Sequence, residues 1–68
     1  MDANKIFITT LTEKTGITYE KIYSVYKESG LQNPKDVCTL FMNSFQLSFG
    51  FANTLAEIII EDDEKKGT

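Results

Sequence analysis

Ser48-Phe49-Gly50-Phe51-Ala52-Asn53 is the stretch that decides the fold of this chain, because it separates two amphipathic segments. A serine directly before an apolar run is a typical helix N-cap, since its oxygen can accept an N–H group that the first turn leaves unpaired. The glycine and the two phenylalanines beside it indicate a closely packed helix entry. We therefore expect a helix to begin at Ser48 and to pack tightly against the preceding segment.

Downstream of this entry, apolar residues continue at the spacing of an α-helix. The stripe comprises Phe51, Ala52, Leu55, Ile58 and Ile59. The triplet Ile58-Ile59-Ile60 argues the other way, because three β-branched residues favour a strand by propensity. No second segment of comparable strand strength is available to pair with the triplet, so we predict that it is helical.

Upstream, three further segments have the same helical period, and each carries boundary signals. The start signals are Asp2, Thr18 and the pair Asn33-Pro34, and the stop signals are Gly16 and Gly30. The second segment also carries three tyrosines on one face, which we expect to pack in the core while their hydroxyls reach water. They are Tyr19, Tyr23 and Tyr26.

These four segments predict an all-α fold, a small bundle of four short helices joined by short loops. The 68 residues allow one domain with a small core, which we place at residues 2–60. The remainder opens with Glu61-Asp62-Asp63-Glu64, and carboxylates at the end of a helix oppose its dipole. We therefore expect an acidic, flexible C-terminal tail over residues 61–68. The four acids lack the glycine turn and alternate spacing of a calcium loop, so no metal site is predicted.

Composition limits the cellular setting and the classes of partner. No apolar run is longer than the three residues of the isoleucine triplet, far below the ~20 residues of a membrane-spanning helix. The first residues lack the basic and apolar regions of a secretion signal, and Cys38 has no second cysteine to pair with, so a cytoplasmic protein is expected. Lysines and acids balance over residues 1–56 without clustering, which disfavours nucleic acid as a partner.

The chain also lacks the residues from which catalytic sites are built. It contains no histidine, and a reactive thiol at Cys38 would need a neighbouring base or cation. We therefore predict that Cys38 is a small, semi-buried apolar residue and that the protein is not an enzyme. Its glycines are far apart and lack a Gly-x-Gly context, so we expect neither a cofactor nor a small-molecule substrate.

Three short motifs carry a resemblance to a known family. They are Lys14-Thr15-Gly16-Ile17-Thr18, Gly30-Leu31 and Phe45-Gln46-Leu47-Ser48-Phe49-Gly50-Phe51-Ala52-Asn53. This pattern resembles that of a family of small bacterial helical domains of unknown function, whose members read K-T-G-x-T, G-L and F-G-L-G-H-G-x-A-N in the same order. The resemblance covers residues 7–56 and implies a compact helical domain without an established activity.

The chain departs from the family pattern at three positions of the last motif. Gln46 and Ser48 replace glycines, and Phe49 replaces the histidine. If the histidine of the family serves a ligand, that role is lost or altered here. If it serves helix packing, Phe49 fills more volume in the same place.

Two functions from different classes remain open at this point. The first is a protein–protein interaction or self-association module, because apolar residues encircle more of the last helix than one core stripe requires. The predicted interaction surface comprises Phe49, Phe51, Leu55, Ile58, Ile59 and Ile60. The rival explanation for these residues is a central helix covered by the other three. The alternative function is a helix-turn-helix-like nucleic-acid-binding pair, formed by the second and third segments and joined at residues 30–33.

The turn at Ser48 and Gly50 is a further candidate site, for an anion. N–H groups at a helix start attract phosphate or carboxylate, and a glycine lets a ligand approach the backbone. The same two residues also fit a helix cap that binds nothing, and both alternatives stay open.

Overall fold

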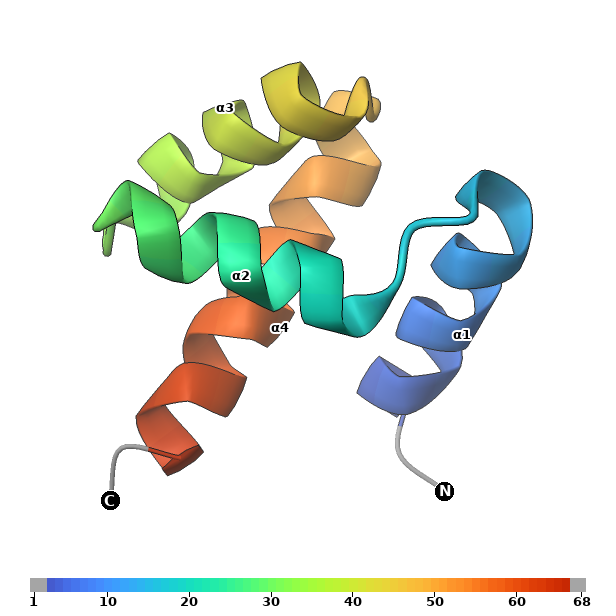
Figure 1. Cartoon of the computed structure of the whole chain (residues 1–68), viewed down its shortest axis with the longest axis horizontal. Coiled ribbons are helices and arrows are strands. Elements are labelled where there is room, and N and C mark those ends of the chain that lie inside the picture. Colours follow the sequence, from blue (N-terminus) through green and yellow to red (C-terminus); the bar gives the residue numbers. More distant parts are fainter. Residues whose placement is uncertain (1–2, 67–68) are drawn as a thin grey trace.

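The computed structural model describes residues 3–66, which form four α-helices joined by short loops (Figure 1). The helices are α1 Ala3–Thr15, α2 Tyr19–Ser29, α3 Pro34–Phe45 and α4 Phe49–Lys66. No strand occurs within this range, so the prediction of an all-α bundle is confirmed. None of the described helices has the combination of length and apolar character that crossing a membrane requires.

The predicted caps of α2 and α3 are present as hydrogen bonds. Thr18 Oγ1 accepts a hydrogen bond from the Lys21 N–H group at 3.2 Å, which holds the first turn of α2. Asn33 Oδ1 accepts one from the Lys35 N–H group at 2.8 Å at the start of α3. The predicted cap of α1, Asp2, lies outside the described residues.

Each of the three loops contains a residue with left-handed backbone. Gly16 and Gly30 have φ angles of +78° and +72°, which glycine adopts without steric penalty. Gln46 does the same after α3, with φ at +54°. A residue with a β-carbon is strained in this conformation, and Gln46 is one of the positions where the resembled family has glycine.

Helix α4 is the central element of the bundle. Its buried residues are Ala52, Leu55, Ala56, Ile58 and Ile59. The other helices supply Leu11 from α1, Ile22 and Tyr26 from α2, and Val37, Cys38 and Phe41 from α3. In Figure 1, α2 crosses in front of the middle of α4, and α3 lies beside its first half. The isoleucine triplet is therefore helical, as predicted, and lies in the helix that the others cover.

The prediction of a flexible tail is wrong for residues 61–66, because α4 continues to Lys66 without a break. Carboxylates in this segment oppose the helix dipole, but two of them, Asp62 and Asp63, accept hydrogen bonds from tyrosine hydroxyls of α2. Two lysines in the last turn also add positive charge where the dipole favours it. Residues 67–68 lie outside the described part of the chain.

Candidate functional site

The residues of the predicted interaction surface differ widely in exposure. Leu55, Ile58 and Ile59 are buried, with exposed fractions of 0%, 4% and 0%. The prediction that these three form a surface is therefore wrong, because the other helices cover them. Phe49, by contrast, is 66% exposed at the first position of α4.

Phe51 and Ile60 lie between these extremes, since both are partly buried and pack against the core. The Phe51 ring lies against Phe7 of α1, with 5.3 Å between the ring centroids. Such aromatic pairs add to the stability that burial provides. Phe51 therefore joins α1 to α4, and it offers only part of its ring to a partner.

Phe49 borders an open pocket of about 340 Å³ between α3 and the first turns of α4. The lining residues, which we call the Phe49 surface, are Lys35, Cys38, Thr39, Met42, Phe49 and Asn53. Met42 is half-buried and contributes the apolar floor together with the buried Cys38. The exposed ring of Phe49 therefore lies beside a pocket whose volume is close to the lower limit for ligand pockets, about 300 Å³.

The helix start at Ser48 and Gly50 is open. The Ser48 carbonyl accepts a hydrogen bond from the Ala52 N–H group at 2.9 Å, as expected of the residue before the helix. A β-carbon added to Gly50 would meet no atom within 4 Å, so no neighbour requires a glycine there. The expected tight packing of this entry is present at Phe51 and Ala52, whereas Ser48, Phe49 and Gly50 are exposed. The anion site at these two residues stays a prediction.

Cys38 belongs to the core. It is 3% exposed, and its thiol lies 4.0 Å from the carbonyl oxygen of Phe49. A reactive thiol must be reached by solvent and by a base, which burial prevents here. Cys38 is therefore more deeply buried than the semi-buried position predicted for it.

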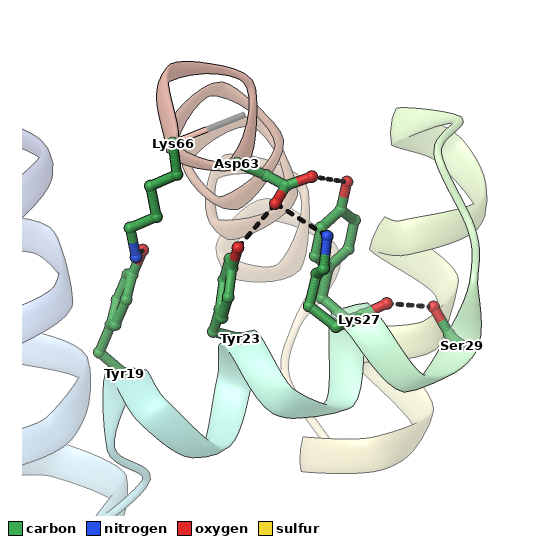
Figure 2. A network of polar contacts seen from close by, with 7 residues as sticks. Tyr19, Tyr23, Lys27, Ser29, Asp63 and Lys66 are labelled. Carbon is green, nitrogen blue, oxygen red and sulfur yellow. Dashed lines mark hydrogen bonds and ion pairs between the residues drawn. The ribbon is translucent and has the colours of Figure 1, made fainter. Parts of the chain in front are cut away.

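A polar cluster that the sequence did not reveal joins α2 to the end of α4. We call it the tyrosine–aspartate cluster, and its members are Tyr19, Tyr23, Tyr26, Lys27, Asp62, Asp63 and Lys66. Tyr23 Oη donates to Asp63 Oδ1 at 2.7 Å, and Lys27 Nζ donates to the same oxygen at 3.1 Å (Figure 2). Tyr19 Oη donates to Asp62 Oδ2 at 3.0 Å. The prediction that the tyrosine hydroxyls simply reach water is therefore wrong.

The same cluster holds the ammonium group of Lys66. The rings of Tyr19 and Tyr23 are nearly parallel, with an interplanar angle of 10° and 6.1 Å between centroids. Lys66 Nζ lies 4.4 Å from the centroid of Tyr23 and 5.1 Å from that of Tyr19. Figure 2 shows the Lys66 side chain reaching from α4 to the hydroxyl end of Tyr19, where Nζ is 3.4 Å from Oη.

Proton affinities in the cluster follow from these contacts. Burial, followed by the hydrogen bond to Asp62, raises the pKa of Tyr19 to about 12. The hydrogen bond to Asp63 is the main cause of the raised pKa of Tyr23. The same bond, followed by that from Lys27, lowers the pKa of Asp63. These shifts favour a neutral Tyr23 hydroxyl facing an ionised Asp63 carboxylate.

The helix-turn-helix alternative requires cations on the exposed sides of α2 and α3. Lys27 is paired with Asp63 at 3.1 Å, which offsets its charge. The exposed start of α3 carries Lys35 directly beside Asp36. Helices that enter a nucleic-acid groove usually carry a concentration of positive charge. This charge pattern gives the alternative little support, and it stays a prediction.

Metal-ligating side chains do not gather in the described part of the chain, where no group of three or more could hold an ion. A comparison with known proteins finds no matching family model, no matching curated protein and no matching solved structure. The resemblance to small bacterial helical domains therefore stays a prediction from the three motifs.

Proposed function

We propose that this chain is a non-catalytic self-association module that forms a homodimer through the Phe49 surface. The observation that carries the proposal is the 66% exposure of Phe49 directly beside an open pocket. A two-fold dimer uses the same patch on both copies, so a projecting side chain and a hollow must lie together. The Phe49 surface contains both features.

A second copy of this chain is the occupant that fits the patch. In the dimer, the Phe49 ring of each copy enters the pocket beside Met42 of the other copy, so both pockets are filled. The volume of about 340 Å³ has room for one phenyl ring. Aromatic side chains buried at the centre of an interface supply much of its binding energy.

The absence of poised reactive groups supports the non-catalytic part of the proposal. The sequence contains no histidine, and its only thiol is 3% exposed. Within residues 3–66, every buried side-chain nitrogen or oxygen atom has a hydrogen-bond partner. A catalytic nucleophile must be reached by its substrate and by a base, and the buried Cys38 thiol of the Phe49 surface does not meet this condition.

Sedimentation and light scattering at micromolar and near-millimolar concentration test the proposal. We expect the wild-type chain to dimerise as its concentration rises and the Phe49→Lys variant to stay monomeric, because a lysine cannot enter an apolar pocket without desolvating its charge. Ile6→Lys is the matched control, since within residues 3–66 Ile6 is the other large apolar side chain with high exposure, at 49%. We expect this control to dimerise like the wild type.

Circular dichroism will show whether both variants keep their helices. A wild-type chain that stays monomeric at both concentrations contradicts the proposal. A folded Phe49→Lys variant that dimerises as strongly as the wild type contradicts it as well.

A further inference from the structure

We infer that the stacked pair Tyr19 and Tyr23 is a binding site for alkylammonium groups, which Lys66 of the same chain occupies. Asp62 and Asp63 supply its negative charge. The site lies at the end of α4 away from the proposed dimer interface, so it goes beyond self-association and does not depend on it.

Ring geometry is the first argument. A cation is attracted to the face of an aromatic ring within about 6 Å of its centroid, because the ring quadrupole is negative there. Lys66 Nζ meets this condition for both rings, at 4.4 Å from Tyr23 and 5.1 Å from Tyr19. The two tyrosines are four residues apart on α2, which places them on the same face of one helix. The helix backbone therefore holds the pair in position before a ligand arrives.

Charge is the second argument. Tyr19 Oη donates its hydrogen to Asp62 at 3.0 Å, which leaves its lone pairs free to accept from an ammonium group. Lys66 Nζ donates to this oxygen at 3.4 Å. Without Lys66, the two carboxylates of Asp62 and Asp63 that accept from the tyrosines face the single ammonium group of Lys27. These carboxylates favour a cation over a neutral ligand of the same shape.

A pocket of about 310 Å³ beside the pair gives room for the hydrocarbon part of the ligand. Its walls include Tyr19 and Asp62 together with the apolar side chains of Ile8 and Ile58. Lys5 also lines this pocket, so its charge favours a ligand whose part in the pocket is uncharged. The site therefore suits a single ammonium group on an alkyl stem, which is the chemistry of a lysine side chain or of a simple alkylamine.

Lys66 acts as a built-in competitor for this site. Its side chain lies in the exposed last turn of α4, so an external ammonium group can displace it without opening the core. Cation–π contacts at exposed positions are weak, so this exchange requires little energy. The occupied and vacated states therefore differ only in the position of one lysine side chain.

Nuclear magnetic resonance of the tyrosine ring protons tests the inference, with n-butylammonium chloride as the probe. The Lys66→Met variant keeps the apolar stem and removes the charge. We expect it to bind the probe roughly two- to fivefold more tightly than the wild type, because the competitor is gone. Lys65→Met is the matched control, since Lys65 pairs with Glu61 at 3.2 Å, and we expect a smaller change.

Further titrations separate charge from shape and identify the source of the ammonium group. n-Butanol has the shape of the probe without its charge, and sodium chloride reproduces its ionic strength; neither should cause saturable shifts. Blocked lysine, N-acetyl-lysine amide, should bind at least as tightly as n-butylammonium if the ligand is a lysine of another protein, and less tightly if it is a free alkylamine.

The inference is overturned if the ring shifts of Lys66→Met do not saturate with n-butylammonium, or if n-butanol causes the same shifts. Equal affinity of Lys66→Met and the wild type also overturns it. Adding Tyr23→Leu to Lys66→Met should abolish the saturable shift of the Tyr19 ring, and circular dichroism will show that this double variant is folded.

Discussion

Gln46 has a left-handed backbone, with φ at +54°, at the point where the chain leaves α3. In this conformation a β-carbon lies too close to a neighbouring carbonyl oxygen, and glycine avoids the contact. The loop must reverse the chain within residues 46–48 so that α4 can pack against α3. The fold therefore imposes the strain at this position.

Replacing this residue by glycine should stabilise the protein. We expect Gln46→Gly to raise the free energy of unfolding by about 1 kcal/mol, because relief of the left-handed strain exceeds the extra entropy of glycine in the unfolded chain. Urea denaturation measures the difference. Gln46→Ala is the control, since it removes the side chain but keeps the β-carbon. A Gln46→Gly variant no more stable than Gln46→Ala would show that the turn is unstrained.

At the scale of the element, the last turns of α4 are held by polar contacts. No apolar residue follows Ile60 in the sequence, so hydrophobic burial cannot dock this segment. The hydroxyls of Tyr19 and Tyr23 bond to Asp62 and Asp63 instead. The length of α4 therefore depends on α2.

Alkaline pH should weaken this contact. The pKa of Tyr19 is raised from 10.0 in the unfolded chain to about 12 in the folded one, mainly by burial and by the Asp62 hydrogen bond. A raised pKa means that the stabilising contribution is complete below pH 10 and is lost as the pH rises through 12. We expect stability against urea to fall over this interval. Tyrosinate absorbance should appear at a higher pH in the folded chain than in the unfolded chain.

Tyr19→Phe is the control for this titration, because phenylalanine keeps the ring and has no ionisable hydroxyl. The variant should lose the step of the absorbance change that occurs at the highest pH. Complete ionisation of all tyrosines of the folded wild type near pH 10 would contradict the raised pKa.

At the scale of the whole molecule, the bundle is organised around α4. Four of its five buried residues, all except Ile58, belong to one core cluster with residues from all three other helices. Neighbouring isoleucines in this helix therefore have different surroundings, since Ile59 is 0% exposed while Ile60 is only partly buried. Position around the helix axis, and not residue type, decides what each contributes to stability.

The two isoleucines give a direct test of this arrangement. We expect Ile59→Lys to unfold the chain, because lost packing and a buried charge together cost roughly 4 kcal/mol or more, comparable to the ~5 kcal/mol stability of a small domain. Ile60→Lys should stay folded, because its ammonium group can reach water. Thermal unfolding followed by circular dichroism measures both. Equal tolerance of the two changes would contradict a central α4.

Helix positions and their ends were predictable because capping, glycine stops and apolar period are local properties of the chain. Thr18, Asn33 and Gly30 act within a few residues of themselves, and they are where the sequence places them. For Cys38 the sequence indicated only partial burial, and the packing of the helices buries it almost completely. The tyrosine–aspartate cluster and the exposure of Phe49, by contrast, depend on contacts between residues that are far apart in the sequence.

Tyr19 and Asp62 are 43 residues apart, and Tyr23 and Asp63 are 40 apart, so no local pattern could pair them. Taken locally, the acids predict a frayed tail, whereas packing of α2 across α4 gives them donors and extends the helix. Which apolar residues of α4 stay exposed was likewise set by the packing of three helices around it. Phe49 projects into solvent because it stands at the end of that packed region, which its residue type alone does not reveal.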